Sequence, residues 1–264
     1  MMKYQISPQQ QDELFHKISH WMADTPPLLM PDNHRLADNP FSVEIPPQPI
    51  AYSGNSRLGF WYQHLCHQLF AGHPNYEILA EEIQLNHQGR TIGALDFVVH
   101  NNATKRSEHW EVAVKFYLLF DGLWYGPNSR DRLDRKLAHM LKHQLAMSQH
   151  PCFKQKYPEL EQIDPKLLMQ GRLYINPFRD ELTPTNCLDF TINSSQINGY
   201  WCFFSELEKI NQPLYVLKKG QWLTGKEPDS SPLQTLGDEF VHCQAQDGRF
   251  WFILPNIWPN HAVK

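Results

Sequence analysis

Cysteine is scarce in this sequence, and the few cysteines are too scattered to build a disulfide framework or a zinc site. Five occur among 264 residues, with no CxxC pair and an odd total: Cys66, Cys152, Cys187, Cys202 and Cys243. This pattern is typical of a reducing compartment, because oxidising compartments favour paired cysteines. We therefore expect a cytoplasmic protein.

Long apolar runs and common catalytic motifs are also missing. No stretch approaches the ~20 apolar residues of a membrane span, and the polar N-terminus, MMKYQISPQQQDELF, lacks the apolar core of a signal peptide. We expect no membrane partner. The sequence has no P-loop, GxGxxG or GxSxG motif, so nucleotide-binding and serine-hydrolase functions lack support.

What is present is the composition of a folded protein. Hydrophobic residues make up 41% of the chain and charged residues 20%, which is typical of globular rather than disordered proteins. The length allows one large domain or a core with extensions. The net charge of −4 argues against a chain that coats nucleic acid over its whole surface, but it allows a local basic patch.

Residues 1–56 predict a helix followed by a proline-rich arm. Ser7 and Pro8 begin a capped helix, and its apolar positions recur at helical spacing: Leu14, Ile18 and Trp21. Seven prolines between residues 25 and 50 exclude long helices and central strands. We expect this segment to pack on the core, because it is too short to bury a stable centre of its own.

Residues 57–178 predict an α/β core. The order of elements is helix, three strands, helix, strand, over residues 58–70, 78–85, 91–100, 109–119, 130–148 and 167–175. The acidic residues within 78–85 also suit a helix, but the NHQG turn that follows favours a strand. This order indicates a mixed sheet flanked by helices.

Residues 179–264 predict a C-terminal extension of mixed helix and strand that packs on the core. The segment NGYWCFFSELEKI suggests a short helix, and two segments suggest strands: PLYVLKKGQWL and GRFWFILP. Their aromatic residues, Trp201, Trp222 and Trp251, should contact the core, because this segment also lacks a sufficient apolar centre of its own.

Alternation along the strand from His109 separates two faces. The apolar face is expected to contact the core: Trp110, Val112, Val114 and Phe116. The other face carries Glu111, Ala113, Lys115 and Tyr117. It is either an ordinary solvent face, as in many antiparallel sheets, or part of a functional site. A Glu111–Lys115 salt bridge does not explain it, because the two residues lie ~13 Å apart on a strand.

Asp96 favours the functional interpretation. It shares its predicted face with Ile92, Ala94 and Val98, and a buried carboxylate is costly unless it is paired or bound to a cation. If the hairpin is centred near residues 103 and 104, Asp96 lies opposite Glu111, with Cβ atoms ~5 Å apart. Carboxylates that close repel each other unless a proton or metal ion lies between them, and Mg²⁺ is the cation that such oxygen ligands prefer.

The predicted helix over 130–148 is basic, which suggests contact with a phosphate backbone. Its candidate nucleic-acid-binding residues are Arg130, Arg132, Arg135, Lys136 and Lys142. The alternative is an ordinary solvated face. His139 and His143, four apart on this helix, are a candidate metal pair, whereas core or surface roles are the default for histidines.

Several segments together resemble the bacterial domain-of-unknown-function family 1853. They are LGFWYQHL, GRTIGALDFVV, HWEVAVKFYL, WYGPN, DRLDRKLAHMLKHQL, and GYW with VLKKGQWL. The resemblance covers most of the chain, with the GPN and HQL elements following the lysine strand in the same order. That family is similar to the PD-(D/E)XK nuclease superfamily, whose restriction-endonuclease-like core is helix, three strands, helix, strand.

The resemblance implies a nuclease that hydrolyses phosphodiester bonds in nucleic acid with Mg²⁺ or Mn²⁺. It places the metal-binding aspartate at Asp96 and the lysine at Lys115, and a further acid of the first helix about where Gln63 stands. The strand pattern itself makes Glu111 the second candidate metal ligand, and Gln63 could assist by hydrogen bonding. The sequence departs from the (D/E)xK pattern, because Ala113 stands where the acid is expected and Gln63 carries no charge. The alternative is therefore a catalytically inactive nuclease fold that serves as a nucleic-acid or protein interaction module.

Overall fold

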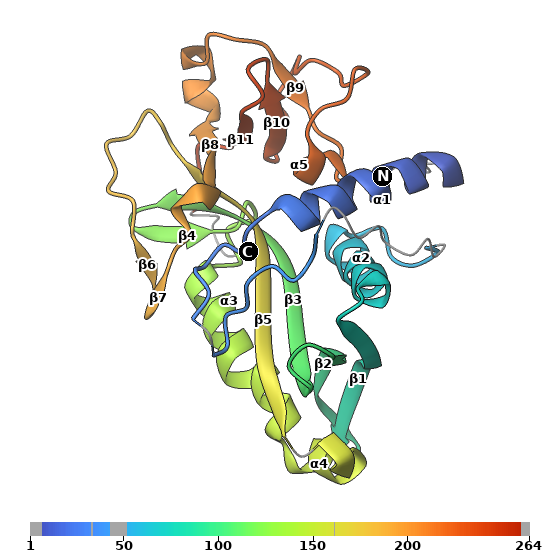
Figure 1. Cartoon of the computed structure of the whole chain (residues 1–264). Helices are drawn as coiled ribbons and strands as arrows, with labels where there is room; N and C mark the ends of the chain where they lie inside the picture. The colour runs from blue at the N-terminus through green and yellow to red at the C-terminus, as the bar shows by residue number, and fades with distance from the viewer. Residues whose placement is uncertain (1–6, 33, 43–51, 161, 260–264) are drawn as a thin grey trace.

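The computed structural model describes residues 7–32, 34–42, 52–160 and 162–259. In this part of the chain, nine strands form one mixed sheet in the order β1-β2-β3-β5-β8-β11-β10-β9, with β4 beside β3. Figure 1 shows the long strands β1, β2, β3 and β5 in the lower part of the molecule, with helices beside them and the C-terminal strands above. The predicted α/β architecture, a mixed sheet flanked by helices, is confirmed.

The core strands follow the predicted order. Helix α2 (Leu58–Gly72) precedes β1 (Tyr76–His87), β2 (Arg90–Asn101) and β3 (Arg106–Phe120), and β5 (Ile163–Ile175) follows the helical segment. β1, β2 and β3 are antiparallel neighbours, whereas β3 and β5 run parallel. The segment over 78–85 is therefore a strand, as the turn after it predicted. The short β4 (Leu123–Tyr125) pairs with the end of β3.

The predicted helix over 130–148 is not one continuous α-helix. It starts three residues later, as α3 (Leu133–His139), widens into the π-helix η1 (Met140–Gln144) and ends as the 3₁₀-helix η2 (Leu145–Gln149). The later start follows a turn in which Ser129 adopts a positive φ of 58°. Pro151 begins the next helix, α4 (Pro151–Lys156), which is followed by η3 (Pro158–Leu160).

The N-terminal helix and arm pack on both sides of this core. α1 (Pro8–Asp24) begins with a capping box between Ser7 and Gln10, and its fully buried side chains include Ile18 and Met22. Leu14 and Trp21, which the sequence placed on the buried stripe, are only partly buried. In the arm, Leu28, Leu29 and Leu36 join the cluster under α3. The prolines at 46, 47 and 49 lie outside the described residues.

The C-terminal strands extend the same sheet. β8 (Ile197–Phe203) pairs in parallel with the end of β5, and β11 (Phe250–Leu254) pairs in parallel with β8. β10 (Val241–Ala245) and β9 (Leu214–Val216) complete this side. The small elements are β6 (Asn186–Cys187), β7 (Phe190–Thr191), η4 (Ser194–Gln196), η5 (Phe204–Lys209) and α5 (Gln221–Thr224).

Two C-terminal predictions were partly wrong. The expected helix in NGYWCFFSELEKI is strand β8 up to Phe203, and only Phe204–Lys209 is helical. The apolar run from Tyr200 to Phe203 therefore lies in the sheet, where Trp201 is fully buried. The expected strand PLYVLKKGQWL stops at Val216, and helix α5 follows after a turn over residues 217–220, whereas GRFWFILP forms β11 as predicted.

Both faces of β3 are covered. Trp110, Val112 and Phe116 pack in a cluster with α1, α2 and C-terminal aromatic residues, and Val114 is partly buried against it. Ala113 and Tyr117 on the other face pack under α3 and the N-terminal arm. The solvent-face interpretation of that second face is therefore wrong.

Among the helices of the described ranges, none combines the length and apolarity that a membrane crossing requires.

Candidate functional site

The candidate site lies where β2 separates from β3. The backbone ladder between these strands runs from Asn101–Arg106 to Phe97–Trp110, where it ends. One step further along this register, Asp96 lies level with Glu111. This is the register assumed in the sequence analysis, because the hairpin is centred between residues 103 and 104. The expected neighbours, Asp96 and Glu111, are thus brought together.

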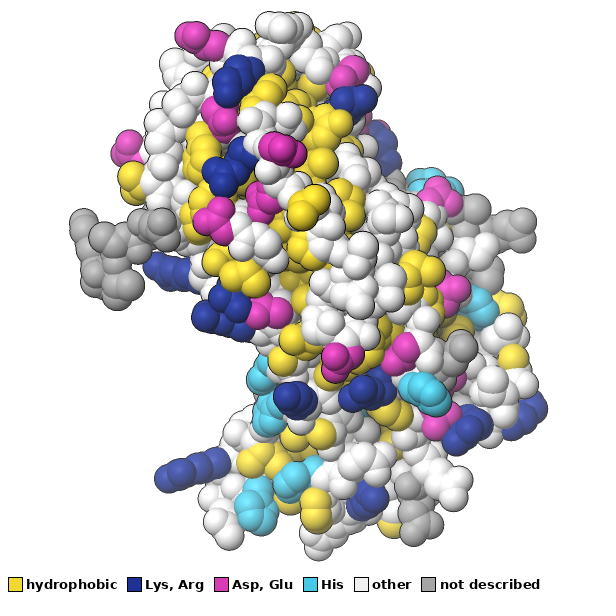
Figure 2. All heavy atoms as spheres, turned by 90° about the vertical axis from the view of Figure 1, so that its left-hand side faces the viewer, with side chains coloured by type: hydrophobic (Ala, Val, Ile, Leu, Met, Phe, Trp, Pro, Cys, Tyr) yellow, Lys and Arg dark blue, Asp and Glu magenta, His cyan; other side chains and the backbone are white. Residues whose placement is uncertain are grey.

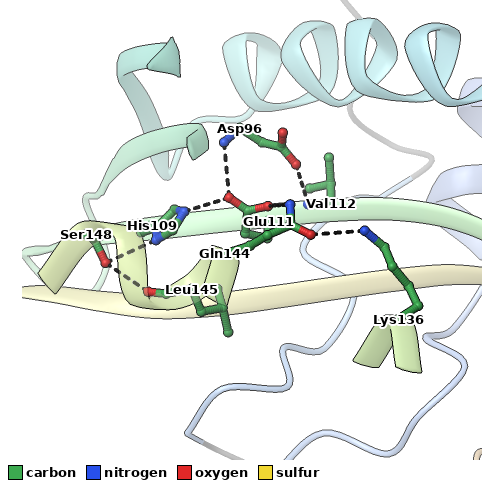
Figure 3. Close-up of polar contacts among 8 residues, drawn as sticks. All are labelled: Asp96, His109, Glu111, Val112, Lys136, Gln144, Leu145 and Ser148. Atoms are coloured by element: carbon green, nitrogen blue, oxygen red, sulfur yellow. Dashed lines mark hydrogen bonds and ion pairs between the residues drawn. The ribbon is translucent and has the colours of Figure 1, made fainter. Parts of the chain in front are cut away.

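Each carboxylate accepts a backbone N–H from the opposite strand (Figure 3). The Asp96 N–H donates to Glu111 Oε1 over 3.3 Å, and the Val112 N–H donates to Asp96 Oδ2 over 3.0 Å. These side-chain oxygens occupy the place of carbonyl groups that would otherwise continue the ladder. The backbone N–H groups that become available where the strands separate therefore hold both carboxylates in position.

Glu111 is fully buried, and its oxygens have further partners. Its Oε1 lies 2.9 Å from His109 Nε2, and Gln144 Nε2 donates to its Oε2 over 2.6 Å. His109 Nδ1 lies 3.1 Å from the hydroxyl of Ser148. Gln144 and Ser148 come from η1 and η2, so the irregular helix over β3 supplies the groups that hold Glu111 and His109 (Figure 3).

Burial shifts the protonation equilibria of all three groups. Burial and the neighbouring Glu111 raise the pKa of Asp96 to about 7, and burial raises the pKa of Glu111 to about 7. Burial also lowers the pKa of His109 to about 4. His109 is therefore neutral at pH 7 and does not compensate the charge of the carboxylates, which favours a proton or an external cation at this position.

The lysine that acts on the two carboxylates is Lys136. Its charge lowers the pKa of both Asp96 and Glu111, and its Nζ donates to Gln144 Oε1 over 3.0 Å. Burial and the nearby Lys115 lower the pKa of Lys136 itself. Lys136, Gln144 and Glu111 thus form a chain of contacts from a cation to the buried acid.

Lys115 pairs with an acid other than Asp96 and Glu111. Its Nζ lies 2.7 Å from Asp131 Oδ2, and the Tyr117 hydroxyl donates to the same oxygen over 3.3 Å. Both side chains of the Lys115–Asp131 pair are about 30% exposed, at 29% and 31%. The ion pair offsets the charge of Lys115 at the edge of the site.

Gln63 and Gln144 lie in opposite layers. Gln63 is half-buried on α2, in the layer that packs on Trp110, Val112 and Phe116. Gln144 lies on η1, in the layer that covers the polar face of β3. Sequence reasoning therefore missed Gln144, His109 and Ser148, and assigned Lys136 to the outer surface. Two features of the sequence could have indicated these residues. The HQL element after the lysine strand contains Gln144, and strand alternation puts His109 on the same face as Glu111.

The candidate nucleic-acid-binding residues fall into two groups. Arg130, Arg135 and Lys142 are exposed, whereas Arg132 pairs with Asp134 through Nε and Oδ1 at 2.9 Å, and Lys136 points inward. Figure 2 shows Lys, Arg and His side chains dispersed over the lower half of the face that α3 and η2 cover. Asp and Glu side chains lie among them in the same view. Arg135 and Lys142 lie on the outer side of the helical segment whose inner side holds Glu111.

The donor set fits a hard divalent cation. No group of three or more His, Cys, Asp or Glu side chains positioned for a metal occurs within the described ranges. Mg²⁺, however, is commonly held by one or two carboxylates, with water and phosphate oxygens completing its coordination. Asp96 and Glu111 match that requirement, because they are two neighbouring carboxylates and the charge of Glu111 raises the pKa of Asp96.

Comparison with known proteins identifies a family and gives no further relatives. The family model described as Domain of unknown function (DUF1853) matches residues 9–247 of the chain. Neither the comparison with curated proteins nor that with solved structures found a match.

Proposed function

The chain belongs to the domain-of-unknown-function family 1853, and we propose that it is a metal-dependent nuclease with a bacterial PD-(D/E)XK-like, restriction-endonuclease-like core. The observation that carries the proposal is the pair Asp96 and Glu111, fixed where β2 leaves β3 and adjoined by Lys136 and Gln144. The order of α2, β1, β2, β3, the α3 segment and β5 agrees with that core.

Asp96 and Glu111 are the residues that would hold Mg²⁺ or Mn²⁺. When bound, the ion would lower the pKa of a water molecule and neutralise phosphate charge. Glu111 is kept in place by His109 and Gln144, which prevents the buried carboxylate from rotating away. Because both acids have a pKa raised to about 7, protons compete with the ion, and metal binding should strengthen as pH rises from 6 to 8.

Lys136 takes the role that the sequence assigned to Lys115. Its half-buried ammonium group is coupled to both carboxylates, so it is suited to stabilise negative charge that develops on a phosphate in the transition state. Lys115, paired with Asp131, would instead fix the segment that leads into α3. Arg130, Arg135 and Lys142 would contact the nucleic-acid backbone outside the site.

The five free cysteines support a location in the reducing cytoplasm.

A specific observation also favours the second candidate, a catalytically inactive fold that binds nucleic acid or protein. Glu111 is 0% exposed, and protein groups contact both of its oxygens. An acid satisfied in this way can serve structure alone. This second function predicts no effect of Mg²⁺ on the protein, whereas the nuclease proposal requires one.

A cleavage assay with matched variants separates the two. Wild-type protein should cleave single- or double-stranded DNA or RNA with Mg²⁺ or Mn²⁺ and lose this activity in EDTA. Asp96→Asn should abolish cleavage while retaining the Val112 contact through the amide oxygen. Asp164→Asn, which alters an exposed ion pair with Arg106, is the control and should remain active. Inactivity of the wild type on all four substrates, with no binding of Mg²⁺, would leave the interaction module as the function.

A further inference from the structure

Two histidines on the exposed side of α1 are placed like a pair of metal ligands. His16 and His20 are both exposed, and their Nε2 atoms share a hydrogen bond over 3.3 Å, which a metal ion would replace. The ring centroids are separated by 4.5 Å, with the rings tilted by 55°. α1 is a regular α-helix of 17 residues, so residues four apart share one face and lean in the same direction.

The nitrogen separation matches the distance between two ligands of one metal ion. Histidine nitrogens bind Zn²⁺ at ~2.0–2.1 Å in tetrahedral geometry, which puts two such nitrogens roughly 3.3–3.4 Å apart. We propose that His16 and His20 form a binding site for a divalent transition-metal ion, with Zn²⁺ as the representative ligand. Imidazole nitrogen favours Zn²⁺, Ni²⁺ and Cu²⁺ over Mg²⁺, so this site differs chemically from the carboxylate pair in the sheet.

The surroundings of the pair allow a cation to approach. The nearest lysine in the sequence, Lys17, has its Nζ 3.0 Å from Glu13 and 2.8 Å from Glu227, so carboxylates offset its charge. No third His, Cys, Asp or Glu completes a metal-binding group within the part of the chain described. Among the described residues the site therefore has two protein ligands, and water or another ligand would fill its other coordination positions.

His139 and His143 provide an internal comparison. They have the same spacing in sequence, but the helix widens into η1 directly after His139, and a π-turn no longer stacks residues i and i+4 on one line. Their ring centroids lie 5.0 Å apart. The sequence analysis singled out this second pair, whereas the regular geometry of α1 assigns the metal site to the first.

The test is calorimetric titration of the untagged, full-length protein with ZnCl₂. Wild-type protein should bind Zn²⁺ at this site, and His16→Ala and His20→Ala should each abolish that binding. His139→Ala should leave it unchanged. Both α1 positions are exposed and alanine favours helix, so the thermal midpoint without metal should not fall in the two α1 variants.

Two outcomes would overturn the proposal: the absence of saturable Zn²⁺ binding by the wild type, or an unchanged number of bound Zn²⁺ ions in both His16→Ala and His20→Ala. Zinc binding that is lost in His139→Ala but kept in the α1 variants would also contradict it. The result is independent of the proposed nuclease, because Asp96→Asn should leave zinc binding intact and His16→Ala should leave Mg²⁺-dependent cleavage intact.

Discussion

The two faces of β3 are both buried, yet they have opposite chemistry. One is lined by Trp110, Val112 and Phe116 and packs among aromatic side chains. The other carries His109, Glu111 and Lys115 and is covered by the irregular helix over residues 133–149. In that helix, Ser148 contacts His109 and Gln144 contacts Glu111. Burial therefore does not distinguish a structural face from a functional one. The distinguishing feature is that Glu111, on the polar face, lies beside a second carboxylate, Asp96, which makes its burial more costly.

Two glutamates on this strand sharpen the comparison. Glu108 is buried and accepts hydrogen bonds from Asn101 Nδ2 at 3.0 Å and Trp110 Nε1 at 2.8 Å. These contacts tie the hairpin and the core together. Glu111 instead lies beside a second acid, and its pKa is raised to about 7. We expect changes on the apolar face to affect stability, and changes around Glu111 to affect chemistry.

The largest expected effect is on the apolar face. Trp110→Ala should lower the free energy of unfolding by about 3–5 kcal/mol, because it removes a buried indole and leaves a cavity. On the polar face, Tyr117→Phe removes only a hydroxyl that donates to Asp131 and should cost about 1 kcal/mol. Urea denaturation measures both. Similar losses in the two variants would contradict the assignment of stability to the apolar face.

The next largest effect is a difference in cleavage rate between variants of two lysines. Lys136→Met should slow Mg²⁺-dependent cleavage by about 10²-fold, because it removes a cation that acts on both carboxylates. Lys115→Met should slow cleavage by less than about tenfold, because the charge of Lys115 is already paired with Asp131. Single-turnover cleavage at saturating Mg²⁺ provides the rates. A larger loss in Lys115→Met would return the catalytic role to Lys115.

A smaller effect follows from the raised pKa values of Asp96 and Glu111. Between roughly pH 4 and 7 the folded protein keeps protons that the unfolded chain has released, so the free energy of unfolding should fall as pH rises through that range. Asp96→Asn removes the repulsion and should be more stable than the wild type at pH 8 without metal, by about 2 kcal/mol. Urea denaturation at pH 4, 6 and 8 tests this.

Two results would count against this pH dependence. One is a free energy of unfolding that rises between pH 4 and 8 in the wild type relative to Asp96→Asn. The other is a pH dependence in Asp164→Asn that departs from the wild type as far as that of Asp96→Asn does, since this control leaves both Asp96 and Glu111 in place.

The smallest effects are expected outside the site. Arg135→Ala and Lys142→Ala should each change the free energy of unfolding by less than about 0.5 kcal/mol, because both side chains are exposed. If these side chains contact phosphate, each substitution should make the negative slope of log affinity against log salt shallower by about 1. Fluorescence anisotropy with labelled oligonucleotides measures this slope. An unchanged slope in both variants would remove this surface from the nucleic-acid interface.

The fold and the pairing of the carboxylates were accessible from the sequence. Alternation after His109 predicted the two faces of β3, and a hairpin assumed to be centred in the short polar loop gives the observed register, which brings Asp96 level with Glu111. These are local properties, because side-chain period and loop length determine them. The covering of the polar face was not predicted, since it depends on how α3 and the N-terminal arm pack from elsewhere in the chain.

The partners of Glu111 could not be predicted because the helix above it is irregular. Lys136 and Gln144 are eight residues apart, an offset of about 80° around an α-helix, and the wider i→i+5 turns of η1 reduce that offset. A regular α-helix would separate the two side chains by nearly a quarter turn, whereas Lys136 Nζ lies 3.0 Å from Gln144 Oε1 in the structure. In the same way, regular spacing alone did not distinguish His16 and His20 from His139 and His143.

The central claim, that Asp96 and Glu111 together hold a hard cation, is tested most directly by Mg²⁺ titration at pH 8. Calorimetry should use the His16→Ala background, so that the imidazole pair does not contribute, and compare it with the same protein carrying Asp96→Asn. We expect saturable Mg²⁺ binding in the first protein and none in the second, because one carboxylate leaves a hard ion underligated. Absence of Mg²⁺ binding in the first, or equal affinity in both, would contradict the claim.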